Sequence, residues 1–215
     1  MRVLLLRPEG SDIPKDPEIE IVNIPILTPV CIDHSLPREF KAVGFTSVNA
    51  VKCFKFLDSI RNVKIYAVGP STAKALIELG FSDVRIPTSY TVDSMVKEMM
   101  KEVGEGLVLV RSNIGYERDK GKYPIFQIVD YELVVNEERL EEARRLLSNC
   151  EFEFVILTSS FIAKLVKDSI RDCTKVISIG PSTTRALEGV NNIYQANEYD
   201  LNGAFILLKK LMRDD

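Results

Sequence analysis

Two short segments place serine and threonine hydroxyls directly after a glycine and a proline. The segment at 69–72 (Gly-Pro-Ser-Thr) follows a short apolar run, and the same four residues return 111 positions later at 180–183. Glycine ends a strand without a Cβ atom, and proline suits the first position of a helix. Hydroxyls placed there lie beside the free N–H groups of the first helical turn, which attract anions. Each hydroxyl alone is also a common helix cap, but two near-identical copies favour a shared anionic ligand.

Other polar side chains recur in the same way at the ends of apolar runs. A Thr-Ser pair follows the run at 43–45 and again the run at 155–157, and an arginine ends the runs at 3–7 and 107–111. In open parallel sheets, ligands bind at the carboxyl ends of the strands. For the hydroxyls the alternative role is helix capping, and for the arginines it is a surface ion pair. The candidate substrate-binding residues are Arg7, Ser47, Ser71, Thr72, Arg111, Ser112, Ser159, Ser160, Ser182 and Thr183.

The elements that must position these side chains are alternating strands and helices. Continuous apolar strands that alternate with helices predict a parallel sheet covered on both faces. A helix from Ser71 is expected to end at Gly80, and another, which opens at Thr91, carries Met95 and Met99 on its inner face. We expect strands at 2–7, 19–24, 41–45, 63–68, 84–86, 107–111, 125–135, 153–157, 175–179 and 192–195, and further helices at 49–59, 136–149, 160–170, 182–188 and 201–212.

The repeats indicate two versions of one βα unit, each a little over a hundred residues long. The chain should therefore form two domains, each with its own sheet. Extended, β-prone stretches at 25–37 and 127–135 are best paired with each other as the crossing between the domains. Domain one would then hold residues 1–30 and 136–215, and domain two would hold residues 38–126.

Composition narrows the function classes. With 46% hydrophobic and 27% charged residues, the 215-residue chain is typical of a soluble globular protein. We find neither a signal-peptide layout nor a run of roughly 20 apolar residues. The net charge of −3 argues against nucleic acid as the main partner. One histidine, His34, cannot build a His-based triad or metal cluster. The spacing of the four cysteines shows no pairs, which predicts reduced thiols in a cytoplasm and no zinc site. These cysteines are Cys31, Cys53, Cys150 and Cys173.

The order of these motifs resembles one family over essentially the whole chain. Leu-Leu-Arg-Pro-Glu at 5–9, Phe-Thr-Ser-x-Asn-Ala-Val at 45–51, the two Gly-Pro-Ser-Thr segments, Leu-Thr-Ser-Ser at 157–160 and Tyr131 are similar to the uroporphyrinogen-III synthase family. The resemblance implies two flavodoxin-like parallel-sheet domains joined by a two-stranded β linker, with the active site in the cleft between them. It also implies a cofactor-free and metal-free lyase reaction, in which linear hydroxymethylbilane loses water and closes to uroporphyrinogen III with the D ring inverted.

The resemblance assigns the main catalytic role to Tyr131. A phenol, whose usual pKa is about 10, can assist departure of a hydroxide because the pyrroles themselves stabilise the resulting cation. The alternative is that Tyr131 only fills space on a β-strand. A rival function is a non-catalytic, two-lobed cytoplasmic binding protein for a small polyanion. We expect a monomer whose partner is a small-molecule polycarboxylate, with no nucleic acid and no membrane.

Overall fold

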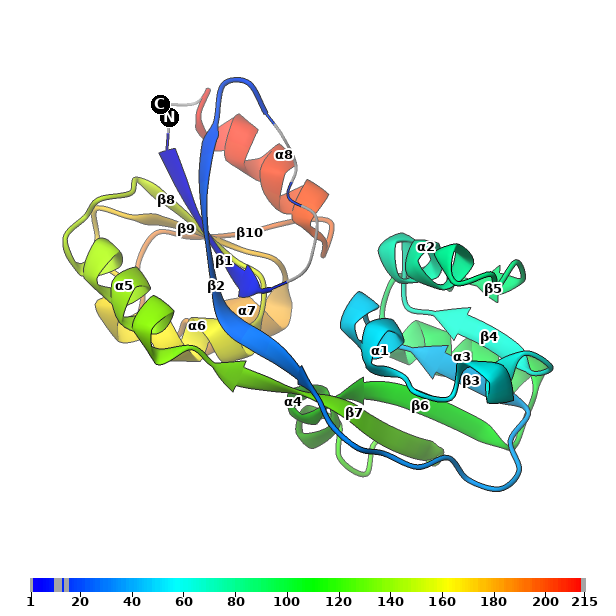
Figure 1. Cartoon of the computed structure of the whole chain (residues 1–215). Coiled ribbons are helices and arrows are strands. Elements are labelled where there is room, and N and C mark those ends of the chain that lie inside the picture. The colour runs from blue at the N-terminus through cyan, green and yellow to red at the C-terminus, as the bar shows by residue number, and fades with distance from the viewer. Residues whose placement is uncertain (1, 10–12, 14–15, 214–215) are drawn as a thin grey trace. The chain divides into compact units, whose positions relative to one another are not determined.

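The computed structural model describes residues 2–9, 13 and 16–213 (Figure 1). Strands and helices alternate along these residues, and the strand pairs inside each half of the sheet are parallel. The predicted α/β class with a mostly parallel sheet is therefore confirmed. In the described part of the chain, no helix is long and apolar enough to cross a membrane.

The chain divides into two compact units. Unit 1 consists of Met1–Thr28 and Val135–Asp215, and unit 2 of Pro29–Val134. Unit 1 is thus discontinuous in sequence, whereas unit 2 is a single stretch. The boundaries predicted from the sequence, with domains at 1–30 plus 136–215 and at 38–126, stay a prediction.

The sheet strands of unit 1 lie in the order β10-β9-β8-β1-β2. Alternate residues of β1, among them Val3 and Leu5, pack against Phe205 and Leu208 of α8. Figure 1 shows α5 and α6 on the other face of this sheet. The elements are β1 (Arg2–Pro8), β2 (Glu20–Cys31), α5 (Glu137–Ser148), β8 (Phe154–Leu157), α6 (Ser160–Val166), the 3-10 helix η2 (Lys167–Ser169), β9 (Lys175–Ser178), α7 (Pro181–Ala186), β10 (Ile193–Gln195) and α8 (Leu201–Leu211).

The sheet strands of unit 2 lie in the order β7-β6-β3-β4-β5. One face packs on α1 and α2, and the other packs on the methionines of α3, Met95 and Met99, which are fully buried as expected. Gly44 faces this helix, where a Cβ atom would lie 2.8 Å from Met99 Sδ. The elements are β3 (Ala42–Phe45), α1 (Val48–Cys53), the 3-10 helix η1 (Leu57–Ile60), β4 (Lys64–Ala67), α2 (Pro70–Glu78), β5 (Val84–Arg85), α3 (Val92–Glu102), β6 (Leu107–Ser112), α4 (Asn113–Arg118) and β7 (Phe126–Val135).

The two units share one strand order. If the strands of unit 1 are numbered in chain order (β1, β2, β8, β9, β10), they lie in the order 2-1-3-4-5. Unit 2 has the same order when β6, β7, β3, β4 and β5 are numbered from 1 to 5. Matching hydrogen bonds support the correspondence: Thr46 Oγ1 donates to the Val110 carbonyl and Thr158 Oγ1 to the Leu6 carbonyl, both at 3.1 Å. The sequence repeats therefore reflect a duplicated arrangement of strands.

Some predicted elements are shorter or longer than expected. Helix α1 ends at Cys53 instead of residue 59, because Phe54 leaves the helix and packs its ring against Phe45, with 5.2 Å between ring centroids. Strand β2 runs unbroken from Glu20 through Pro25 to Cys31, so the strand predicted at 19–24 and the first part of the extended stretch predicted at 25–37 form one element.

The prediction of reduced cysteines is wrong. Cys31 and Cys53 form a disulfide in unit 2, and Cys150 and Cys173 form one in unit 1, with Cα–Cα distances of 5.1 and 5.9 Å. The partners are 22 and 23 residues apart in sequence, so only the tertiary fold brings them together. The cysteines therefore give no support to the predicted reducing compartment.

Candidate active site

The hydroxyl of Tyr131 meets two of the predicted serines in unit 2. Tyr131 is 4% exposed, and its oxygen lies 2.8 Å from Ser47 Oγ, with Ser112 as a second hydroxyl partner. Ser47 follows β3 and Ser112 ends β6, so both hydroxyls lie at the carboxyl ends of neighbouring strands. This is the edge of a parallel sheet at which ligands bind.

A β-bulge aims Tyr131 at this cluster. Val129 pairs with Arg111, but the next pair is Tyr131 with Ser112, so Asp130 is an extra residue without a partner in β6. Simple alternation predicts Tyr131 on the face of Val129 and Leu133. Tyr131 instead packs in one cluster with Ile128 and Leu133, since the bulge shifts the alternation by one residue. The placement of Val129 was therefore predicted wrongly. Bulges commonly re-aim a side chain beside a functional site.

The environment keeps the Tyr131 phenol protonated at neutral pH. Burial raises its pKa above the usual value near 10, and the hydrogen bonds with Ser47 and Ser112 oppose this only in part. The negative charge of an ionised Asp130 acts in the same direction as burial. A protonated phenol within a cluster of hydroxyls can donate a hydrogen bond or a proton to a departing oxygen.

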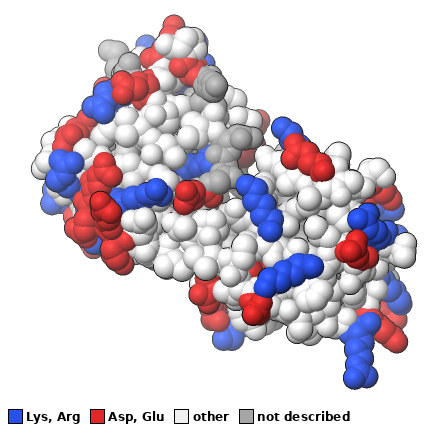
Figure 2. Space-filling view, in the orientation of Figure 1, with Lys and Arg blue, Asp and Glu red and all other residues white. Residues whose placement is uncertain are grey.

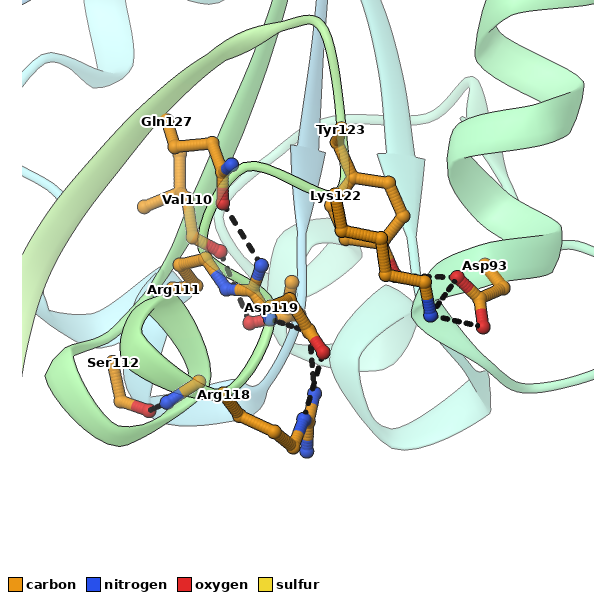
Figure 3. A network of polar contacts seen from close by, with 11 residues as sticks. Asp93, Val110, Arg111, Ser112, Arg118, Asp119, Lys122, Tyr123 and Gln127 are labelled. Atoms are coloured by element: carbon orange, nitrogen blue, oxygen red, sulfur yellow. Dashed lines mark hydrogen bonds and ion pairs between the residues drawn. The ribbon is translucent and has the colours of Figure 1, made fainter.

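Arg111 lies in a buried ion-pair network beside this cluster. Its guanidinium donates to Asp119 at 2.5 Å and to Gln127 Oε1 at 2.9 Å, and Figure 3 shows the three side chains pointing toward one another. Arg111 is 1% exposed, so the ion pair is not the surface contact that the sequence left open. Burial alone would raise the pKa of Asp119, but hydrogen bonds from Arg118 and Arg111 lower it to about 2. The charge of Arg111 is thus balanced inside the protein.

Three of the predicted serines cap helices. Ser47, Ser112 and Ser159 accept the N–H groups of Ala50, Gly115 and Ile162, respectively, at 3.0 to 3.2 Å. The capping role that the sequence left open is therefore present at all three. Ser47 does more than cap, because the same hydroxyl also contacts Tyr131.

The Gly-Pro-Ser-Thr junctions differ from ordinary capped helices. Gly69 and Gly180 are the N-cap residues of α2 and α7, and neither helix has a side-chain cap. Thr72 and Thr183 are buried, and the Thr183 hydroxyl has no hydrogen-bond partner within the described residues. Ser71, in the first turn of α2, is exposed.

The remaining predicted residues lie at or just after strand ends of unit 1. Ser160 is half-buried at the start of α6, directly after the cap residue Ser159. Ser182 is exposed in the first turn of α7. Arg7 is buried near the end of β1, and its Nε donates to the Pro8 carbonyl at 3.3 Å. These side chains thus come from the elements that the repeat predicted.

Two tyrosines that the sequence reasoning missed cover the Gly-Pro-Ser-Thr junctions. A Cβ atom on Gly69 would lie 3.5 Å from the Cβ of Tyr90, and one on Gly180 would lie 3.2 Å from Cδ1 of Tyr199. Both tyrosines are more than half exposed. A signal was present, because each precedes the cap residue of a helix, Thr91 or Asp200. The repeat therefore extends further than the motifs used above.

The described residues contain no group of three or more histidine, cysteine or acidic side chains that could hold a metal ion. On the face shown in Figure 2, basic and acidic side chains are interspersed without a large field of one sign. The polar groups that stand out are thus hydroxyls, backbone amides and the Arg111 network.

A sequence model of one protein family, described as uroporphyrinogen-III synthase HemD, matches residues 15–206. The chain belongs to the uroporphyrinogen-III synthase family. The resemblance inferred from the motifs is thereby confirmed, and the family is one of tetrapyrrole biosynthesis. A comparison with curated protein sequences found no significant match.

A solved structure of uroporphyrinogen III synthase from Thermus thermophilus shares the fold. A mutant form is 13% identical, with a TM-score of 0.55 over 100% of this chain and 99% of that one. The wild-type enzyme from the same bacterium is also 13% identical, with a TM-score of 0.43 over 99% and 98%. The family match supports the predicted synthase function, and none of these comparisons favours the non-catalytic binding protein.

Proposed function

We propose that this chain is a uroporphyrinogen-III synthase, a lyase that closes hydroxymethylbilane to uroporphyrinogen III with loss of water and inversion of the D ring. The family match over residues 15–206 supports the activity. The single structural observation behind the mechanism is the Tyr131 hydroxyl, held 2.8 Å from Ser47 at the carboxyl edge of unit 2. The reaction belongs to tetrapyrrole and heme biosynthesis.

Tyr131 is proposed to assist the first chemical step. The bond between the hydroxymethyl carbon and its oxygen breaks, the phenol gives its proton to the departing oxygen, and water leaves. The pyrrole nitrogen supplies the electron pair that stabilises the resulting azafulvene cation. A single acid group of this kind contributes on the order of 10² to 10⁴ in rate. The remaining acceleration comes from holding the flexible substrate in a folded conformation.

The substrate carries many carboxylates, and the proposed binding groups are helix N-termini with hydroxyls beside them. Backbone amides and hydroxyls bind carboxylates without a strongly basic protein, in keeping with the net charge of −3. Because Arg111 is already paired, we assign it to holding the start of α4, which Ser112 caps, and not to direct charge neutralisation. The proposed binding residues are Arg7, Ser47, Ser71, Thr72, Ser112, Ser159, Ser160, Ser182 and Thr183.

The proposed architecture is two flavodoxin-like domains joined by two β-strands. The strand order 2-1-3-4-5 in both units supports it, because this is the flavodoxin-like order. We further propose a cytoplasmic monomer that binds neither nucleic acid nor a metal or cofactor.

The deciding experiment is an isomer assay with hydroxymethylbilane. Without an enzyme the substrate closes to the type I ring, so a synthase changes the product to type III. A binding protein that lacks catalysis would leave type I as the product, and that result would overturn the proposal. Chromatography of the oxidised products separates the two isomers.

A further inference from the structure

Asp130 is a fully buried carboxyl group next to the proposed catalytic tyrosine. It is 0% exposed, and neither carboxyl oxygen has a hydrogen-bond partner in any other described residue. Its backbone is held by pairing, since the carbonyl accepts the Ile32 N–H at 3.0 Å. Asp130 is the extra residue of the bulge that aims Tyr131 at Ser47.

Unit 1 contains the same bulge without a carboxyl group. Arg7 pairs with Pro25 and Pro8 pairs with Leu27, so that Ile26 is the extra residue, as Asp130 is in unit 2. The Ile26 carbonyl accepts the Asn136 N–H at 3.0 Å, the counterpart of the bond between Ile32 and Asp130. Ile26 is also 0% exposed. An aliphatic side chain is thus compatible with this bulge, and the fold by itself does not require an acid here.

The surroundings of Asp130 favour its neutral form. Burial raises the pKa of its carboxyl group to about 8, and no cation among the described residues offsets this effect. The ionisable groups on the neighbouring elements are otherwise engaged or exposed: Arg111 on β6 is paired with Asp119, Asp33 after β2 is paired with Lys55, His34 hydrogen-bonds the Ile32 carbonyl, and Glu132 on β7 is exposed. Tyr131 is the group on which the charge of Asp130 acts, since that charge raises the pKa of the phenol.

We propose that Asp130 is a positioning residue that acts through Tyr131: as a neutral acid it leaves the phenol able to give up its proton, and its ionisation suppresses that transfer. The catalytic consequence rests on the proposed synthase function, whereas the coupling between the two side chains does not. Asp130 thereby gives the reaction an alkaline limit that Tyr131 alone would not impose, since an isolated phenol titrates near pH 10.

Direct titration of the phenol tests the coupling without any catalysis. The ultraviolet difference spectrum between the wild type and Tyr131→Phe reports ionisation of Tyr131, and the difference between Asp130→Asn and the double variant reports it without the carboxyl group. Asparagine keeps the size and removes the charge, so we expect Tyr131 to ionise at lower pH in Asp130→Asn. Equal ionisation in both backgrounds overturns the proposal.

The pH profile of turnover tests the catalytic consequence. We expect kcat of the wild type to fall as the pH rises through about 8, and this fall to move about one pH unit or more higher in Asp130→Asn, with KM little changed. Glu132→Gln is the matched control, because it removes an exposed carboxylate two residues along the same strand. A wild-type profile in Asp130→Asn overturns the proposal. If neither the wild type nor the variants make the type III product but the titration shows coupling, the proposed function fails and the coupling between Asp130 and Tyr131 stands.

Stability against pH provides a third readout. The pKa of this carboxyl group is about 8 in the native protein and about 3.9 in the unfolded chain. Its contribution to the stability of the fold is therefore complete at pH values below the unfolded pKa and is lost as the pH rises through the native pKa. The unfolding constant of the wild type, relative to that of Asp130→Asn, should therefore rise about tenfold per pH unit between these values. Should Asp130→Asn fold poorly, Asp130→Ile, which copies Ile26, serves the same measurements. If the ratio of the two unfolding constants does not change with pH, the assignment of Asp130 as a buried neutral acid is overturned.

Discussion

The strand pair β1–β2 of unit 1 and the pair β6–β7 of unit 2 have the same backbone but different side chains. Arg7 corresponds to Arg111, and the bulge follows immediately in both pairs. After it, unit 1 has Leu27 where unit 2 has Tyr131. Pro8 and Ile26 in turn replace Ser112 and Asp130, so unit 1 keeps only the counterpart of Ser47, which is Ser159, and lacks the other polar groups of the cluster.

This difference separates what the fold needs from what it does not need. The bulge, the buried position of the residue after it and the threonine bond to the strand carbonyl occur in both units, so they belong to the fold. The phenol, the neighbouring hydroxyl and the carboxyl group occupy these positions in unit 2 and not in unit 1. Unit 1 thus serves as an internal control for substitutions in unit 2.

The largest expected effect is the loss of stability when the Arg111–Asp119 ion pair beside the unit 2 cluster is broken. Asp119→Asn leaves the Arg111 guanidinium buried without a counter-charge, so the free energy of unfolding should fall by about 3–5 kcal/mol in urea titrations near neutral pH. The wild type should lose stability as the pH falls from about 4 to about 2, because the pKa of Asp119 is lowered in the native state, and Asp119→Asn should lack this loss. Asp58→Asn, in an exposed ion pair, is the control and should cost less than about 1 kcal/mol. Equal losses in the two variants would contradict the prediction.

Next in size is the loss of the phenol itself. Tyr131→Phe should lower kcat by about ten- to a thousandfold with little change in KM, because the hydroxyl acts mainly in the transition state. The melting temperature should hardly move, since the ring stays packed. Tyr131→Leu, which copies Leu27, should fold and be at least as inactive. Tyr194→Phe on β10 is the control. Full activity in Tyr131→Phe would reduce Tyr131 to a packing residue.

The two disulfides should differ in their effect on turnover. Each closes a loop of similar length, so replacing both cysteines of either pair by serine should cost about 3 kcal/mol of stability. Cys53 ends α1, whose cap residue Ser47 contacts Tyr131, so loss of the pair with Cys31 should also lower kcat. Loss of the Cys150 pair should affect stability alone. Identical kcat values in the two variants, measured below their melting temperatures, would argue against this link.

The smallest expected effects concern the buried threonines of the two junctions. Thr183→Val removes a hydroxyl without a partner among the described residues and keeps the shape, so stability should stay the same or rise. If this hydroxyl binds a substrate carboxylate, KM or kcat should nevertheless worsen at an unchanged melting temperature. Thr72→Val tests the corresponding position in unit 2. A loss of about 1 kcal/mol of stability with full activity in both variants would return these residues to a structural role.

Local features were predictable from the sequence because their causes lie within a few residues. The helix from Ser71 ends before Gly80, whose φ of 92° favours glycine, and the cap residues Ser47 and Asn136 lie where short-range preferences put them. The repeat was visible because whole strand–helix junctions recur. The alternation of strands with helices and the family resemblance were predictable from the same local patterns.

Features that depend on pairing between distant segments were not predictable. The shift that moves Val129 off the face of Tyr131 arises from the register with β6, which no local pattern in β7 encodes. The disulfide partners and the pairing of Arg111 with Asp119 likewise require the folded chain. Tyr90 and Tyr199 were overlooked, although their positions before helix caps repeat between the units.

The discontinuity of unit 1 determines the order in which the nascent chain can fold. Strand β1 pairs with β8, which lies far along the chain after the whole of unit 2, so the first two strands emerge from the ribosome without their sheet. Unit 2 is continuous, and its pairings are complete once β7 has been synthesised. The unit with the polar cluster can therefore fold first, while the apolar β1 waits as an exposed segment open to aggregation or to chaperones.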